Sequence, residues 1–129
     1  MLKKCQRNLK KWHREANLFY GETESLPFKD ESFDVVFHIG GINFFNDKSR
    51  AIRGMIRVAK SGTKIVISVE TEKHVNGAYE KTPWSGKYFS DRTEAVTPPT
   101  ALFPEGMQDV RLKEFREGSL TCLTFRKPT

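Results

Sequence analysis

The chain has 129 residues and a mass of 14.9 kDa, which is enough for one compact domain with a single hydrophobic core. Its 37% hydrophobic and 29% charged residues are typical of a globular protein and exclude a disordered or fibrous one. Six of the 22 basic residues fall within residues 1–14, where no acidic residue occurs, so the net charge of +6 belongs to one segment and a nucleic-acid partner is not expected.

The cysteine pattern and the lack of a long apolar stretch indicate the compartment. Cys5 and Cys122 lie far apart and form neither a C-x-x-C pair nor a Cys/His cluster, so we expect reduced thiols and no metal site. The first 15 residues are too charged for a secretory signal, and no later stretch reaches the ~18 apolar residues of a membrane span. We therefore expect a cytoplasmic protein with no membrane partner.

Residues 1–14 have the spacing of an amphipathic helix. Leu2, Cys5, Leu9 and Trp12 recur every three or four residues and so share one face, with the bases elsewhere. We expect this face to pack against the protein. A basic helix that docks on phosphates or on an anionic membrane is the alternative.

The next segments follow the order of a parallel sheet. We predict strands at residues 16–20 (ANLFY), 32–39 (SFDVVFHI) and 64–69 (KIVISV), the second of them covered on both faces. Between the last two, Asp47 is a helix N-cap and Gly62 a helix stop. The apolar residues of this helix recur at helical spacing: Ala51, Ile52, Met55, Ile56 and Ala59.

The remainder predicts a long connection and a hairpin. Residues 71–104 are polar and punctuated by Gly and Pro, which favours a loop-rich insertion or lid, or else an ordinary ordered loop with aromatic anchors. Residues 108–115 and 119–126 are β-rich runs joined through Gly118, the pattern of an antiparallel hairpin. We expect residues 1–129 to form one domain with a mixed sheet.

Three stretches, taken in order, match the pattern of one family. They are G-E-T-E-S-L-P-F-K-D-E-S-F-D-V-V-F at residues 21–37, R-V-A-K-S-G at 57–62 and T-F-R-K-P at 124–128. Together they resemble the class I S-adenosylmethionine-dependent methyltransferases, in particular domains of the type 11 kind. The resemblance covers essentially the whole chain.

The resemblance implies an α/β fold of the Rossmann-like methyltransferase type. The family sheet has the order 3-2-1-4-5-7-6 with strand 7 antiparallel, and the cofactor lies across the carboxyl ends of strands 1, 2 and 4. On that template residues 16–20 match strand 3, residues 33–39 strand 4, residues 64–69 strand 5, and the hairpin strands 6 and 7. The chain then begins after strand 2 and holds a partial fold that lacks the first two strands.

The loop after strand 3 implies an adenine contact. Glu22 and Thr23 match the acidic side chain and the backbone amide that hold the adenine ring, where the family more often has Asp and Ala. Glu24 matches an acidic position that commonly follows. The alternative is that these acids only solvate a loop.

The end of strand 4 implies the methyl site. His38, Ile39 and Gly40 match the residues whose backbone approaches the methionine moiety, and Gly40 with Gly41 would permit a close approach. The catalytic residue is unknown. His38 is a candidate base, with a packed structural histidine as the alternative.

In this family, residues after strand 4 and between strands 5 and 6 determine which methyl acceptor is used. Here these are Asn43, Phe44, Phe45, Tyr79 and Trp84, whose aromatic character indicates a small, partly apolar methyl acceptor. The same side chains could instead cover the core.

Several features depart from the family. Gly54 stands where a Glu is usual, Ser61 where a Pro is, and Thr63 where the second Gly is. A Gly inside a helix costs on the order of 1 kcal/mol relative to Ala. No G-x-G-x-G loop occurs in the sequence, so we expect the isolated chain to bind S-adenosylmethionine weakly or not at all.

The missing strands imply an assembly. Strand 33–39 would lose its inner neighbour and expose an edge that pairs readily with another chain. We expect a homodimer or an exchanged assembly through this edge, or else residues 16–20 moving in beside it. The functional alternatives are a methyltransferase and a non-catalytic remnant that serves as a binding or oligomerisation module.

Overall fold

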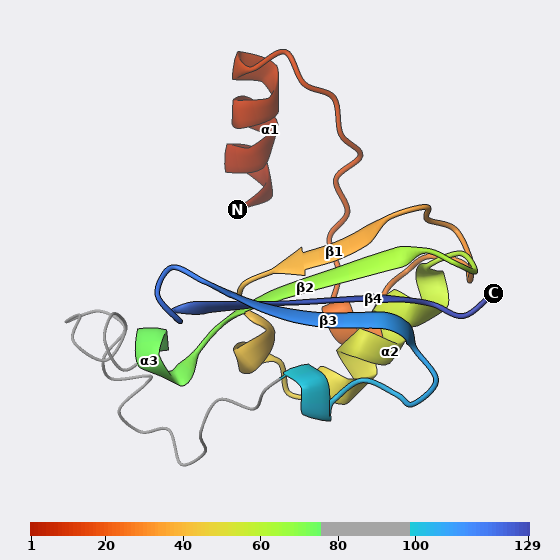
Figure 1. Ribbon diagram of the computed structural model, residues 1–129. Helices are drawn as coiled ribbons and strands as arrows, with labels where there is room; N and C mark the ends of the chain where they lie inside the picture. The colour runs from red at the N-terminus through yellow and green to blue at the C-terminus, as the bar shows by residue number, and fades with distance from the viewer. Residues whose placement is uncertain (76–98) are drawn as a thin grey trace.

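The computed structural model describes residues 1–75 and 99–129 (Figure 1). The elements in chain order are α1 (Leu2–Lys11), η1 (Thr23–Ser25), β1 (Val36–Ile39), η2 (Ile42–Phe44), α2 (Lys48–Val58), β2 (Lys64–Glu70), α3 (Glu72–His74), η4 (Pro99–Ala101), β3 (Gln108–Phe115) and β4 (Leu120–Arg126).

The four described strands form one mixed sheet in the order β1-β2-β4-β3. β1 and β2 are parallel, with Val36 opposite Ile65, whereas β4 is antiparallel to both β2 and β3. The predicted fold class is confirmed, including the parallel pair and the closing hairpin. The order corresponds to 4-5-7-6 of the methyltransferase template, and β1 is an edge strand.

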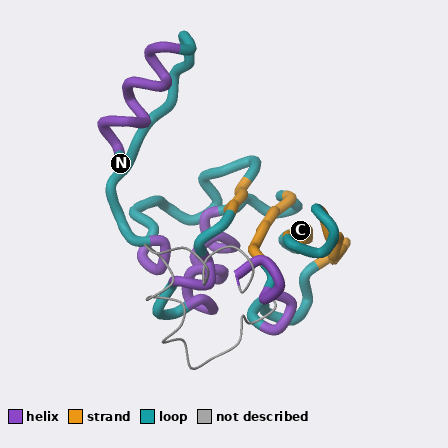
Figure 2. Tube along the Cα trace, turned by 90° about the vertical axis from the view of Figure 1, so that its left-hand side faces the viewer, coloured by secondary structure: helices purple, strands orange, loops and turns teal. Residues whose placement is uncertain are grey.

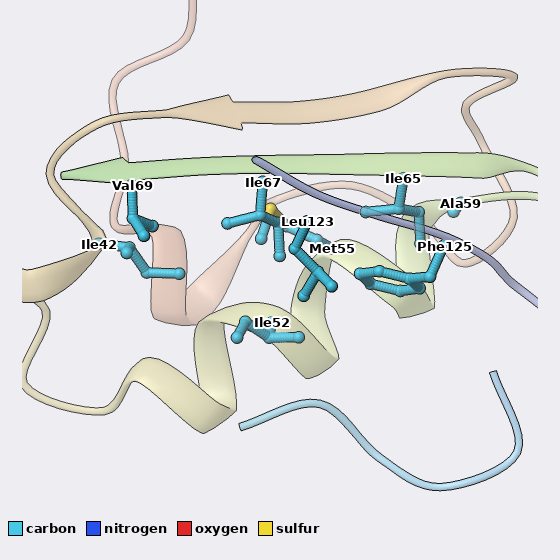
Figure 3. Packing of buried hydrophobic residues seen from close by; sticks show 9 residues of the cluster. All are labelled: Ile42, Ile52, Met55, Ala59, Ile65, Ile67, Val69, Leu123 and Phe125. Carbon is cyan, nitrogen blue, oxygen red and sulfur yellow. The ribbon is translucent and has the colours of Figure 1, made fainter. Parts of the chain in front are cut away.

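The hydrophobic core lies between one face of the sheet and α2 (Figure 3). Side chains alternate along a strand, so every second residue of β2 and β4 points toward α2. The buried cluster comprises Ile42, Ile52, Met55, Ala59, Ile65, Ile67, Val69, Leu123 and Phe125. We call this side of the sheet the core face.

Helix α2 begins as predicted and ends earlier than predicted. The Asp47 carboxylate accepts a hydrogen bond from the Arg50 backbone N–H at 2.8 Å, which caps the helix. The helix ends at Val58, so the prediction that Gly62 stops it was wrong. Ala59 is already extended because it forms a parallel bridge with Phe33. Gly62 instead occupies the turn into β2.

The predicted strand at residues 16–20 was also wrong. A strand needs a neighbour for its backbone hydrogen bonds, and this segment pairs with none of the strands that the structure describes. Phe19 packs edge-to-face on Phe28 instead, with ring centroids 4.9 Å apart. The segment therefore does not move in beside β1.

Helix α1 forms as predicted but does not pack as predicted. None of its residues is buried, and Trp12 next to it is 66% exposed. Figures 1 and 2 both show α1 projecting away from the sheet. Among the helices that the structure describes, none combines the length and the apolar character needed to cross a membrane.

Gly54 weakens α2 without serving a steric need. A Cβ at this position would lie 3.6 Å from the Thr23 carbonyl oxygen and 3.8 Å from Leu26 Cδ1, which are ordinary contacts. We expect Gly54→Ala to raise the free energy of unfolding by about 0.5–1 kcal/mol, because alanine loses less backbone entropy in a helix. Urea denaturation measures this.

Gly41→Ala is the matched control for Gly54→Ala. Its φ of +74° is left-handed and its surroundings are open, so only backbone strain acts there. This variant should lower the free energy of unfolding. Equal losses in both variants would contradict the analysis of Gly54.

Candidate functional site

The candidate site lies where the parallel strands β1 and β2 end. The carboxyl ends of parallel neighbours meet at the same edge of a sheet, and ligands of open α/β sheets bind there. β1 is followed by Gly40 and Gly41, and β2 ends at Glu70. The pairing therefore places these residues side by side.

Gly40 is required by this geometry. Its φ is +69°, and its backbone N–H donates to the Ser68 carbonyl at 2.8 Å, so the chain turns sharply where β1 ends. A Cβ at this position would lie only 3.1 Å from Glu70 Oε1. The sequence analysis did not single out Glu70, although its position at the end of the second parallel strand was a usable signal.

Asn43 is held at the same edge. Its Nδ2 donates to the Glu70 backbone carbonyl at 3.2 Å, and Ile42 beside it is anchored in the core. The Asn43 Oδ1 atom is buried and has no hydrogen-bond partner among the described residues. A buried polar atom without a partner is uncommon and marks a place where a ligand group can bind.

His38 is the titratable group of the site. Its ring is half-buried on the core-face side of β1, and the centroids of the His38 and Phe45 rings are 5.2 Å apart. The His38 Nε2 atom is buried and has no hydrogen-bond partner among the described residues. Burial lowers the pKa of His38 below 6.5, opposed by a backbone hydrogen bond at Gly40 and by the charge of Glu70. At neutral pH the imidazole is uncharged and can accept a proton.

A groove of about 340 Å³ runs along the free edge of β1. Thr23 of η1 and His38 of β1 both line it, so two segments that the sequence assigned to opposite ends of a cofactor meet in one hollow. The rest of its lining is apolar: Leu26, Phe28, Phe33, Val35, Val36, Phe37, Met55 and Val58. Its size is that of a small-molecule site.

The acidic residues after the predicted third strand have unequal positions. Glu22 is exposed at the start of η1. Glu24 Oε1 accepts hydrogen bonds from the backbone N–H groups of Asn46 at 3.0 Å and Asp47 at 3.3 Å. Glu24 therefore ties η1 to the start of α2, a structural role that local spacing could not reveal.

The remaining predicted residues lie in different places. Ile39 is 73% exposed and its side chain points to the face opposite His38, so only its backbone faces the site edge. Phe44 is 59% exposed at the end of η2. Tyr79 and Trp84 lie outside the described residues.

Arg57 fixes one wall of the groove. Its Nη1 donates to the Phe28 carbonyl and the Asp30 carboxylate, both at 2.7 Å, and its Nη2 donates to the Leu26 carbonyl at 2.9 Å. A planar guanidinium suits three acceptors in a fixed arrangement. The arginine of R-V-A-K-S-G therefore holds the loop of the first family stretch.

The comparisons with known proteins identify the family and the fold. A family model described as "Methyltransferase domain" matches residues 1–67, just over half of the chain. The chain belongs to the class I S-adenosylmethionine-dependent methyltransferase family. The mixed sheet, with a site at the carboxyl ends of its parallel strands, is the framework of that class.

The relatives are named as methyltransferases of different kinds. The human protein named "Probable tRNA methyltransferase 9B" is 33% identical over 92 residues, covering 63% of this chain and 20% of its own length. The ubiquinone/menaquinone biosynthesis C-methyltransferase of Shewanella sediminis is 40% identical over 52 residues, covering 40% and 21%. The chain thus spans about a fifth of the length of these relatives.

A solved structure shows the same fold. The S-adenosylmethionine-dependent methyltransferase from Thermotoga maritima superposes with a TM-score of 0.69 at 19% identity, covering 95% of this chain and 70% of that one. This likeness extends the fold assignment over nearly the whole chain.

Arg57→Lys tests the wall of the groove. Lysine cannot serve three acceptors from one plane, so we expect the free energy of unfolding to fall by about 1–2 kcal/mol. Arg53→Lys is the matched control in the same helix, because among the described residues the exposed Arg53 side chain donates a hydrogen bond to the Ser49 hydroxyl alone. Similar losses in both variants, measured by urea denaturation, would contradict a special role for Arg57.

His38→Gln tests the burial of the imidazole. Because the folded pKa lies below 6.5, the unfolded chain binds the proton first as the pH falls through that value. The free energy of unfolding should therefore fall more in the wild type than in His38→Gln between about pH 7.5 and about pH 5.5.

Denaturation at both pH values measures the difference, and His13→Gln at an exposed position is the control. A parallel pH dependence of wild type and His38→Gln would show that the His38 pKa is not lowered by folding.

Proposed function

We propose that this chain forms the part of a cytoplasmic S-adenosylmethionine-dependent methyltransferase domain that lines the adenine and methyl ends of the cofactor site. The observation that carries the proposal is the groove at the edge of β1, which Thr23 and His38 share. When bound, the cofactor supplies an activated methyl group that transfers by in-line displacement. The task of the protein is then mainly to align acceptor and methyl group.

The residues present fit one part of this cofactor. Gly40 lets a ligand approach the backbone at the end of β1, and the apolar groove suits a flat ring beside η1. Glu22 and Thr23 would hold the ring, and the backbone of residues 38–40 would face the methyl end. The sequence has no G-x-G-x-G loop for the remaining part, so this chain by itself binds the cofactor more weakly than micromolar.

His38 and Asn43 are the polar groups that meet the acceptor. Each contributes one buried atom without a partner among the described residues, His38 Nε2 and Asn43 Oδ1. The uncharged imidazole accepts a proton where the acceptor must lose one, and Asn43 orients the acceptor by a hydrogen bond. Phe44 and Phe45 form the apolar part, which favours a small-molecule acceptor.

A non-catalytic role is the second candidate, and the free edge of β1 favours it. Phe37 on this edge strand is 66% exposed and Ile39 is 73% exposed, which is unusual for large apolar residues of a strand. In this role the chain is a binding or oligomerisation module that forms a homodimer through residues 33–39.

The proposal is tested by adding S-adenosylmethionine to the isotope-labelled chain and following backbone amide shifts. We expect shifts at millimolar ligand for Thr23 and Gly40 and none for Lys113 of β3, because only the first two lie at the site. Calorimetry should show binding weaker than micromolar. A complete absence of shifts would favour the non-catalytic role.

Gly40→Ala and Gly106→Ala form a matched pair for this experiment. Both glycines have left-handed φ, but only a Cβ at Gly40 meets Glu70, whereas Gly106 has open space around it and lies in the turn before β3. Gly40→Ala should abolish the ligand-induced shifts and Gly106→Ala should keep them. Loss of the shifts in both variants would contradict the assigned position of the ligand.

A further inference from the structure

The carboxylate of Glu70 lies at the candidate site without a charged partner among the described residues. Glu70 is the last residue of β2 and is partly buried. The ion pairs and side-chain hydrogen bonds among the described residues do not include its carboxylate. Lys73, the next basic residue along the chain, is engaged elsewhere, because its Nζ donates to the Glu117 carbonyl at 2.6 Å. A carboxylate that loses water needs a cation or hydrogen-bond donors in exchange.

The side chains beside Glu70 add further acceptors. Asn43 Nδ2 donates to the Glu70 backbone carbonyl at 3.2 Å, which fixes the orientation of the amide, and the acceptor atom Oδ1 is left without a partner among the described residues. His38 Nε2 also has no described partner, and it is an acceptor in the tautomer that carries its hydrogen on Nδ1. The charge of Glu70 raises the pKa of His38, so the carboxylate and the imidazole are near enough to interact. Acceptors from β1, η2 and β2 therefore gather at one edge of the sheet.

Two glycines leave room at this edge. Because Gly40 has no Cβ, the Glu70 carboxylate can lie against the backbone where β1 ends, and a Cβ built there would be 3.1 Å from Oε1. A Cβ built at Gly41 would meet nothing within 4 Å, so the space at the start of η2 is open. Asn43 belongs to η2 itself. We expect a small group to approach the carboxylate from the Gly41 side.

We propose that Glu70 binds a protonated amine of the methyl acceptor, with Asn43 Oδ1 as a second acceptor of its hydrogen bonds. A primary or secondary ammonium group brings a positive charge and two or three N–H donors, which are what a set of acceptors lacks. This deepens the proposed function and rests on it, because it names the acceptor class for the same site. Glu70 is then a specificity-determining residue, whichever atom of the acceptor receives the methyl group.

Other acceptor chemistries fit these residues less well. An anionic acceptor would be repelled by Glu70. A hydroxyl group has a single donor hydrogen and no charge, so it would leave most of the acceptors unsatisfied. The aromatic ring of Phe45, whose centroid is 5.2 Å from that of His38, also favours a cation because the face of an aromatic ring attracts positive charge.

Three small probes that share one ring test the charge of the ligand. Benzylamine is protonated at pH 7, benzyl alcohol is neutral and benzoate is anionic. Each is titrated into the isotope-labelled wild-type chain while backbone amide shifts are followed. We expect benzylamine to shift Gly40 and Asn43 with an affinity at least about tenfold higher than that of either other probe, because it alone offers a charge-assisted hydrogen bond. Lys113 of β3 should not shift.

Glu70→Gln and Glu105→Gln form a matched pair for the benzylamine titration. Both remove one negative charge, but Glu105 precedes β3, which starts opposite Arg126 at the end of the sheet where β2 begins. Glu70→Gln should weaken benzylamine binding by at least about tenfold, and Glu105→Gln should leave it nearly unchanged. The comparison of the three probes uses the wild-type chain, so it stands whether or not a variant folds.

S-adenosylmethionine has an ammonium group of its own, so a competition separates the two sources of this chemistry. With S-adenosylmethionine at a concentration that gives the full Thr23 shift, benzylamine should still bind. Displacement of benzylamine would assign the ammonium site to the cofactor and overturn its assignment to the acceptor.

The remaining outcomes separate this inference from the proposed function. Equal affinities for benzylamine and benzyl alcohol, or unchanged binding in Glu70→Gln, would overturn the inference even where S-adenosylmethionine shifts Thr23 and Gly40. Binding of benzylamine through Glu70, with no shift from S-adenosylmethionine, would overturn the methyltransferase role and leave an ammonium site that is not a methyl-acceptor site.

Discussion

The parallel pairing of β1 with β2 is the constraint on which the rest of this structure depends. It sets Ile39, the last residue of β1, opposite Ser68, so that Gly40 meets Glu70 where β2 ends two residues later. It also fixes which side of β1 faces α2, since a shift by one residue would turn His38 to the other face. The groove, the half-buried imidazole and the Asn43 contact are all consequences of this register.

Hydrogen bonds explain part of the first two family stretches, residues 21–37 and 57–62. Arg57 of the second stretch donates three hydrogen bonds to the loop of the first, and Glu24 of the first accepts two from the start of α2. These bonds close η1 over α2 and shape the wall beside Thr23. Part of the sequence pattern of this family therefore serves to hold a loop against a helix, and the ligand contacts depend on that support.

Helix α2 covers one face of the sheet, and no described helix covers the other. This difference between the two faces relates the site to the proposed assembly. The core face is sealed by α2, while the opposite face and the free edge of β1 keep large apolar side chains in water. A cofactor site at such an edge would have one wall, and for this reason too we expect weak binding by this chain. The same unsealed surfaces are the ones that a second copy can cover.

The sequence by itself determined that a helix begins after Asp47, that a strand begins at Lys64 and that a hairpin closes the chain, because periodicity, capping and turn residues are local signals. It also determined the family. It also located Gly40 and His38 at a strand end. Only the tertiary structure decided that residues 16–20 form no strand, that α1 has no buried face and that α2 ends at Val58. Each of these depends on whether a partner is present: a strand needs a neighbour, the apolar face of a helix needs a surface, and Ala59 leaves the helix to pair with Phe33.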